Sequence, residues 1–577
     1  FRSTPAGTLP ARDDVIATIR RGLPGTSMPG YAGLLDPAEI ERLARFVLSL
    51  APRTSKDAPA IALADAPPDS SEARQRGAAL YERLGCAACH GPDGRLPSWQ
   101  PPREGPGGPS PAANLREPWT FRGGHEPRDI ALRILTGLDG SAMPAYARAI
   151  TGREAWDIAH FVRGLARVPA WRETDPEAVA RAGISRDPLE RGRYLTNAML
   201  CPLCHTPISA RDGSYDTSRF LAGGMRVSAY PWGVWYSRNL TPDPDTGLGR
   251  WSEEEIVTAF TRGIARDGRR LDPMAMPWPW FARLTPEDAR AVAVYLRALP
   301  AIANAVPAAR HVPAPEGVGG KLLALLGAET AVEFSGGNAA ADPALREEPP
   351  APTGRRLAAW VLGASTLGGG AAGLLLALVS RRRRALGLVG GLILVAWAAL
   401  AIWPPLGLMN PDTTVRWLFL GAPTLPPALD GPPRALAERG RYVATVAPCG
   451  LCHTPAGAFV GFYTGRTLAG GMEARWRVYG RAVSSNLTPH PGDGVASLPD
   501  EALLRAMRSG IGRDGRAMHW QAMPWDIGSR WSEEDQRALL AYLRALPPVA
   551  GTVPAPRGPA PDDPTADAFY FGDTARR

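Results

Sequence analysis

The chain has 577 residues, 45% of them hydrophobic, and a formal net charge of +9. This length is too great for one domain and predicts three to five. The positive charge comes from arginines that are scattered along the sequence apart from one run of four, which argues against a nucleic-acid-binding protein.

The six cysteines all belong to one pattern, C-x-x-C-H, which occurs three times. This pattern is the attachment signature of c-type haem, in which two thiols bond to the vinyl groups and the histidine ligates the iron. A zinc site would need further ligands close by, whereas these pairs lie more than a hundred residues apart. We therefore predict three haems c. Their covalent attachment points are Cys86, Cys89, Cys201, Cys204, Cys449 and Cys452, and their proximal iron ligands are His90, His205 and His453.

Residues 1–52 are interpreted as the C-terminal part of a cytochrome c domain that lacks its haem motif. A helical run over 13–22 precedes a Met-Pro pair at Met28, and a second helix follows with Asp36 as its N-cap. The same layout recurs 115 residues later, where Met28 maps to Met143. The sequence therefore predicts a fourth haem motif upstream of this chain, with Met28 as the distal ligand.

Three complete haem domains are predicted, at 68–170, 188–301 and 435–549. The last two are copies of one domain, because long segments recur at an offset of 247 or 248 residues. Leu-Ala-Gly-Gly-Met recurs at 221 and 468, Asn-Leu-Thr-Pro at 239 and 486, and Ala-Met-Pro-Trp at 275 and 522. Residues 302–356 are predicted to be a linker and 550–577 an extended tail.

A transmembrane helix hairpin is predicted over 357–409, between the two copies. Its runs 357–380 and 385–403 are apolar, and each is about long enough to cross a bilayer. The four arginines from Arg381 to Arg384 connect them, and short arginine-rich loops stay in the cytoplasm. We therefore expect a protein of the bacterial inner membrane, with its haem domains on the periplasmic side. The expected fold class is mainly α, with several small class I cytochrome c domains plus this two-helix transmembrane hairpin.

A Met-Pro pair downstream of each motif is predicted to supply the distal iron ligand. Methionine raises the haem potential, and the proline restricts the backbone that presents the thioether. His/Met ligation saturates the iron, which suits electron transfer and leaves no position for peroxide or oxygen. No catalytic residue is predicted. The predicted distal ligands are Met143, Met276 and Met523, and the open alternatives are Met274 in place of Met276 and Met518 or His519 in place of Met523.

The long domains resemble the multihaem cytochrome c subunits of membrane-bound bacterial alcohol, gluconate and related dehydrogenases. The resemblance rests on Gly-Arg-Tyr-Leu, Cys-x-x-Cys-His-Thr-Pro, Asn-Leu-Thr-Pro-Asp, Met-Pro-Trp and Tyr-Leu-Arg-Ala-Leu-Pro. It implies that electrons pass from a periplasmic dehydrogenase through successive haems to ubiquinone or a terminal oxidase. It also implies the same proximal histidines and distal methionines.

The predicted function is a membrane-anchored electron relay that is not an enzyme by itself. Its donor would be a dehydrogenase or quinol, and its acceptor a later component of a respiratory chain. The expected partners are subunits of a dehydrogenase or other redox complex, the membrane and a quinone, with no nucleic acid. Two alternatives stay open: a haem-relay subunit of a larger respiratory or photosynthetic complex, and a peroxidase-like haem enzyme.

Overall fold

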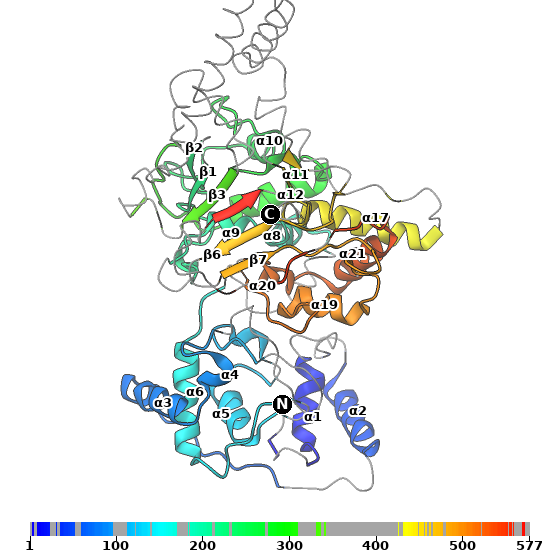
Figure 1. The fold of residues 1–577 in the computed structure, drawn as a ribbon. Helices are drawn as coiled ribbons and strands as arrows, with labels where there is room; N and C mark the ends of the chain where they lie inside the picture. The colour runs from blue at the N-terminus through cyan, green and yellow to red at the C-terminus, as the bar shows by residue number, and fades with distance from the viewer. Residues whose placement is uncertain are drawn as a thin grey trace, which may run out of the picture. The chain divides into compact units, whose positions relative to one another are not determined.

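The fold is that of a computed structural model (Figure 1). It describes residues within 3–51, 59–95, 112–169, 183–309, 330–341 and 431–558, apart from gaps such as 23–30 and 272–274, together with Leu425 and the strand Ala568–Phe571. These residues form two compact units. The first comprises Phe1–Arg181, Leu498–Ser532 and Pro556–Gly558, and the second comprises Ala182–Ser497, Glu533–Ala555 and Pro559–Arg577.

The regular elements of the first unit are helices in its described part, apart from one isolated bridge between Ile511 and Ala517. Asp36 caps α2 as predicted, because its Oδ1 accepts from the Glu39 N–H at 2.8 Å and Glu39 Oε2 accepts from the Asp36 N–H at 2.9 Å. The elements are α1 (Arg12–Arg21), α2 (Pro37–Ser49), α3 (Ser71–Arg83), α4 (Ala87–His90), η1 (Pro118–Thr120), α5 (Pro127–Thr136), α6 (Gly152–Gly164), α19 (Asp500–Ser509) and α20 (Trp525–Gly528).

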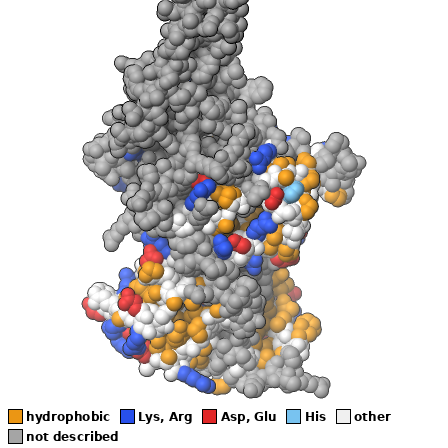
Figure 2. Space-filling model, in the orientation of Figure 1, with side chains coloured by type: hydrophobic (Ala, Val, Ile, Leu, Met, Phe, Trp, Pro, Cys, Tyr) orange, Lys and Arg blue, Asp and Glu red, His pale blue; other side chains and the backbone are white. Residues whose placement is uncertain are grey.

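The first unit holds two apolar cores of different size. The larger is formed chiefly by α3, α5 and α6 around Tyr81 and Trp156. The smaller lies between α1 and α2. It leaves Phe46 of α2 60% exposed and Leu50, the residue after α2, 65% exposed. Hydrophobic side chains also gather on the surface of this unit in Figure 2. Among the described residues, those within 1–52 therefore form a much smaller buried apolar cluster than those of the haem domain that follows them.

The second unit combines helices with a six-stranded sheet of order β2-β1-β3-β8-β6-β7, which was not predicted from the sequence (Figure 1). Its helices are α8 (Pro188–Ala198), α9 (Cys201–His205), η2 (Thr217–Arg219), α10 (Glu253–Arg262), α11 (Trp278–Phe281), α12 (Pro286–Ala298), α17 (Gly431–Val446), α18 (Cys449–His453) and α21 (Glu533–Ala545). Its strands are β1 (Arg226–Ala229), β2 (Gly233–Tyr236), β3 (Thr330–Ser335), β4 (Ala456–Gly457), β5 (Gly461–Phe462), β6 (Glu473–Trp476), β7 (Gly480–Val483) and β8 (Ala568–Phe571).

One helix crossing recurs in all three haem domains. The helix before each motif meets the last helix of its domain at a glycine, where a Cβ would approach a backbone carbonyl oxygen to about 2 Å. The residue before that glycine is an arginine, which pairs with an aspartate of the last helix at 2.7–2.9 Å. The crossings are Arg76-Gly77 with Asp157, Arg191-Gly192 with Asp288, and Arg439-Gly440 with Asp535.

The expected fold class must be corrected at one point, because the predicted transmembrane hairpin is not supported. No helix in the described part of the chain is long and apolar enough to cross a membrane. The longest described helix, α17, has 16 residues, whereas a bilayer crossing needs about 20 apolar residues. Residues 357–409 themselves lie outside the described residues, as does Met28. The structure supports a mainly helical fold that is compatible with cytochrome c domains.

Replacing Gly77 by alanine tests the helix crossing. A Cβ at this position would lie 2.1 Å from the Asp157 carbonyl oxygen, so we expect Gly77→Ala to lower the unfolding free energy by about 2–3 kcal/mol. The matched control is Gly164→Ala at the end of α6, where the added Cβ would make an ordinary contact with Arg74. Denaturant unfolding of both variants checks this, and equal stabilities would contradict the role of Gly77.

Candidate haem-binding sites

Each C-x-x-C-H motif forms a short helix that follows the longer helix carrying the Arg-Gly pair of the crossing. In the first motif the Cys89 and His90 N–H groups donate to the Cys86 carbonyl at 3.1 and 3.0 Å. The other two motifs form α9 and α18. One helical turn brings the residues at positions one, four and five of the motif to neighbouring places on its surface. This arrangement lets two thiols and one imidazole reach the same group.

Each of the three motif histidines makes the same kind of hydrogen bond to the backbone. Their Nδ1 atoms lie 2.7–2.8 Å from a backbone carbonyl oxygen. Because a carbonyl only accepts, Nδ1 carries the proton and Nε2 keeps its lone pair for a metal. Burial lowers the pKa of His205 to about 4 and also lowers the pKa values of His90 and His453, which favours the neutral ring. The accepting carbonyls are those of Ala113, Arg238 and Ser485.

The Asn-Leu-Thr-Pro loop holds two of these carbonyls in place. Asn239 directly follows Arg238, and its Oδ1 accepts from the Thr241 N–H at 3.0 Å and from the Thr241 hydroxyl at 2.8 Å. Its Nδ2 donates to the Ile302 carbonyl at 2.7 Å. Asn486 makes the corresponding contacts with Thr488 and Val549 beside Ser485. Sequence reasoning used this motif to recognise the repeat and the family resemblance, and missed that it supports the histidine.

The residues around the second motif fit haem c. Burial raises the pKa of Cys201 to about 12 and that of Cys204 to about 11, as expected for neutral thiols in apolar surroundings. Arg226 is only 7% exposed, and its Nε and Nη2 have no hydrogen-bond partner among the described residues. A buried cation without an anion is unfavourable, and a haem propionate is an anion of suitable size. His205 and the thiols would hold the haem. Arg226 follows Gly223, whose N–H donates to the His205 carbonyl at 2.6 Å, by three residues, and its buried side chain is suited to a propionate.

The predicted distal methionines Met276 and Met523 occupy equivalent turns. In each, the methionine carbonyl accepts at 2.7 Å from the N–H of the tryptophan two residues later. The indole N–H of that tryptophan, Trp278 or Trp525, then donates to a backbone carbonyl at 3.2 or 3.1 Å. The second of these carbonyls belongs to Met518, which thus matches Leu271 at an offset of 247. This equivalence favours Met523 over Met518, and Met276 remains the prediction because Met274 lies outside the described residues.

Met143 lies in the first unit, half-buried, in a turn where its N–H meets the Ser141 hydroxyl at 3.2 Å. His90 belongs to the same unit, and His205 and Met276 both belong to the second. His453 belongs to the second unit and Met523 to the first. The structure therefore places the first two predicted ligand pairs each within one compact body.

A buried charge cluster anchors the segment that carries Met523 within the first unit. Arg167 Nη2 lies 3.3 Å from Glu117 Oε1 and 3.2 Å from Asp526 Oδ2, and all three residues are buried. The guanidinium carbon lies 3.8 Å from the ring centroid of Trp520 and 4.9 Å from that of Trp119. Burial and the nearby Arg167 lower the pKa of His519, so this residue is neutral. Sequence reasoning missed this cluster because its members are 50 and 359 residues apart.

Comparison with known proteins identifies one domain directly. Residues 72–162 match the family described as cytochrome C oxidase, cbb3-type, subunit III. This part of the chain is a cytochrome c domain. The match agrees with the helical fold around the first motif and with the chemistry of its cysteines and histidine.

The relatives include cytochrome subunits of dehydrogenases. The chain is 39% identical over 121 residues to the fructose dehydrogenase cytochrome subunit of Gluconobacter japonicus, covering 21% of this chain and 23% of that protein. It is 37% identical over 143 residues to a nicotinate dehydrogenase subunit of Pseudomonas putida, covering 25% and 11%. It is 29% identical over 128 residues to a diheme cytochrome c-type protein of Cereibacter sphaeroides, covering 22% and 40%. The matched parts thus span less than half of each relative's length.

A solved structure also matches part of the chain. The chain is 26% identical to a chain of a Kuenenia stuttgartiensis reducing HAO-like protein complex, with a TM-score of 0.25, covering 29% of this chain and 77% of that one. The expected resemblance to cytochrome c subunits of bacterial dehydrogenases is confirmed by the sequence relatives.

Asn239→Ala tests the support of the histidine. The variant leaves the buried Thr241 N–H without its acceptor and removes the closer of two donors to the Ile302 carbonyl, so we expect the unfolding free energy to fall by about 1–3 kcal/mol. A redox titration should show one haem with an altered potential, since the carbonyl that accepts from His205 is less well fixed. Asn486→Ala is the matched variant and should alter a different haem. Unchanged titrations for both variants would contradict the role of this loop.

Glu117 predicts a pH dependence of stability. Burial raises its pKa to about 7, against about 4.3 for a free glutamate. Below about pH 4 the carboxyl is protonated in both states, and as the pH rises to 7 the unfolded state ionises first, so the folded state loses stability. We expect Glu117→Gln to gain on the order of 3 kcal/mol relative to the parent between pH 4 and pH 8. Urea unfolding across this range measures the difference, and a pH-independent difference would contradict the raised pKa.

Proposed function

We propose that this chain is a multihaem electron relay with one haem c at each of its three motifs. The observation that carries the proposal is the same histidine arrangement in all three, with Nδ1 held by a backbone carbonyl and Nε2 available. A zinc site would gather four ligands in one place, and no group of three or more His, Cys, Asp or Glu side chains in the described ranges could hold a metal ion. Haem c supplies a one-electron iron couple when bound.

The residues of the chain would hold the iron in a saturated state. The hydrogen bond from each histidine Nδ1 to a backbone carbonyl fixes the ring whose Nε2 would ligate the iron. The Met-Pro-Trp turns fix the backbone of Met276 and Met523 through the main-chain N–H and the indole N–H of the tryptophan. Rigid ligands reduce the rearrangement that accompanies a change of iron charge, which favours fast electron transfer. This role agrees with relatives that are named as cytochrome subunits of dehydrogenases.

The proposed donor is a dehydrogenase, because relatives are named as subunits of fructose, alcohol, gluconate and nicotinate dehydrogenases. A quinol is the alternative donor, and ubiquinone or a terminal oxidase is the proposed acceptor. We place the haem domains on the periplasmic side, because the covalent attachment of haem to C-x-x-C-H motifs takes place there. The chain would act as the electron-transfer subunit of such a redox complex rather than as an enzyme by itself.

Spectroscopy of the purified chain tests the relay function. We expect covalently bound haem, a sharp c-type α-band on reduction, and no change on adding carbon monoxide at neutral pH, because each iron has two protein ligands. A large carbon monoxide shift in the unaltered chain would instead support a peroxidase-like enzyme with an open iron. Absence of covalent haem would overturn the relay.

Methionine variants test the distal ligands with matched controls. Met276→Ala and Met523→Ala should each open one iron and create a carbon monoxide shift for about one haem of the three. The control variants are Met274→Ala, two residues from Met276, and Met518→Ala, five residues from Met523. Neither control should create a carbon monoxide shift. The opposite pattern in either pair would transfer the ligand role to the neighbouring methionine.

A further inference from the structure

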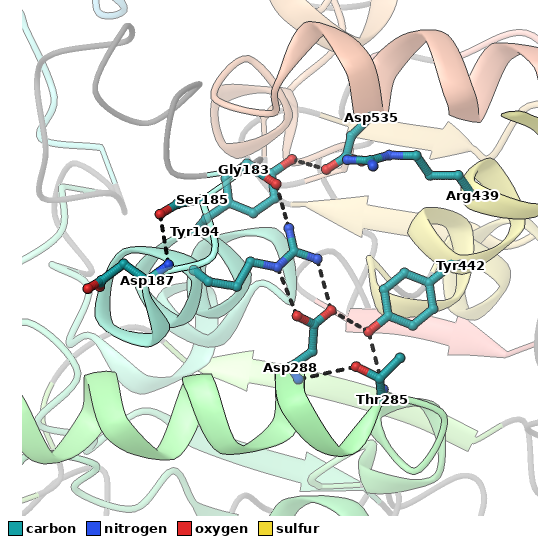
Figure 3. A network of polar contacts seen from close by, with 10 residues as sticks. Gly183, Ser185, Asp187, Tyr194, Thr285, Asp288, Arg439, Tyr442 and Asp535 are labelled. Atoms are coloured by element: carbon teal, nitrogen blue, oxygen red, sulfur yellow. Dashed lines mark hydrogen bonds and ion pairs between the residues drawn. The ribbon is translucent and has the colours of Figure 1, made fainter.

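The two long haem domains exchange equivalent hydrogen bonds within the second unit. The Tyr442 hydroxyl donates to Asp288 Oδ2 at 2.6 Å, and the Tyr194 hydroxyl donates to Asp535 Oδ2 at 2.5 Å (Figure 3). Tyr194 and Tyr442 are 248 residues apart, and Asp288 and Asp535 are 247 apart, so each contact is the repeat image of the other. The contact surface is therefore self-complementary, as in a twofold symmetric dimer.

These contacts use the aspartates of the helix crossings. Arg191 pairs with Asp288 inside one domain through Nε and Nη2, both at 2.8 Å, and Arg439 Nε pairs with Asp535 inside the other at 2.9 Å. Each carboxylate thus receives an arginine from its own domain and a tyrosine from its neighbour. Burial, with the Asp288 carboxylate as a second cause, raises the pKa of Tyr442, so its hydroxyl stays a donor.

The sheet follows the same symmetry. The hairpin β1–β2 recurs 247 residues later as β6–β7, and the two hairpins occupy opposite ends of the sheet. Strand β3 pairs with β1, β8 pairs with β6, and β3 and β8 pair with each other antiparallel at the centre. Two independent sets of contacts, polar side chains and backbone ladders, thus join the domains in one twofold arrangement.

One long domain touches the haem motif of the other within the second unit. Trp280 of α11 is 3% exposed, and its benzene ring lies against Gly450, the residue after Cys449. A Cβ on Gly450 would lie only 2.4 Å from Trp280 Cη2. The repeat image of Gly450 is Pro202, and that of Trp280 is Ile527. Trp280 also lies four residues after the predicted ligand Met276, so one short segment spans both haem sites.

We infer that the parts of the two long domains that lie in the second unit form one internal twofold pair, and that Trp280 is the positioning residue for electron exchange between their haems. This inference rests on the proposed relay function. Electron transfer rates fall steeply with distance through protein, and a tightly packed aromatic ring shortens the gap better than an aliphatic side chain and water. The reciprocal Tyr–Asp hydrogen bonds fix the separation of the two domains, and Trp280 fills the space between them beside the motif Cys449–His453.

Photoinduced electron transfer in the full holo-chain tests this role. A ruthenium photosensitiser is attached at Glu254→Cys, an exposed position of the domain that carries Cys201–His205, and the redistribution of the electron between haems is followed at the α-band. We expect Trp280→Leu to slow the redistribution tenfold or more and Trp280→Phe to restore most of the rate. The matched control is Trp251→Leu, a half-buried tryptophan of the same domain, which should leave the rate within twofold.

A second variant tests the pair as a unit. The double variant Tyr194→Phe with Tyr442→Phe removes both reciprocal donors and keeps the rings, so we expect slower redistribution and separate thermal transitions of the two domains. Intact haem content with unchanged rates in the Trp280→Leu and double-tyrosine variants would overturn the inference alone. An unaltered chain without covalent haem would overturn the proposed function and the inference with it.

Discussion

The close crossing of two helices in each haem domain is the constraint on which the rest of the structure depends. A glycine without a side chain lets the helix before the motif lie directly on the last helix, and the arginine before it pairs with an aspartate there. The motif begins nine residues after this glycine in each domain. The position of the helix that leads into the two thiols and the histidine is therefore set by a point where no side chain fits between the two helix backbones.

The same crossing also explains how the long domains associate. Asp288 and Asp535 bind an arginine inside their own domain, and their remaining acceptor capacity meets a tyrosine of the other domain. A buried carboxylate with two donors is satisfied, whereas one with a single donor would leave a lone pair without compensation. Folding of each domain and pairing of the two domains thus share the same residues.

The sequence predicted the parts of the structure that local chemistry determines. The three motifs, the Asp36 N-cap and the repeat of the long domain followed from residue type and spacing, and the dehydrogenase-subunit resemblance is confirmed by the relatives. The Arg167 cluster, the reciprocal tyrosines and Trp280 could not be predicted, because they join residues that are far apart in the chain. The repeated Gly-Arg-Tyr and Asn-Leu-Thr-Pro segments were visible, but their contacts depend on a packing that periodicity does not describe.

The transmembrane hairpin was predicted from two apolar runs and is not supported, because no described helix meets the length and apolarity that a bilayer crossing requires. The sheet was missed for a different reason. Its strands have four to six residues and join different parts of the chain, so no single stretch carries a clear alternating pattern.

The central claim is that each of the three equivalent histidine arrangements belongs to a bound haem. Intact-mass spectrometry of the chain, produced in cells that attach c-type haem, tests it most directly. The account predicts a mass equal to the polypeptide plus three covalent haems, with all six cysteines unavailable to thiol reagents. A chain with free thiols at any motif, or with zinc in place of haem, would contradict it.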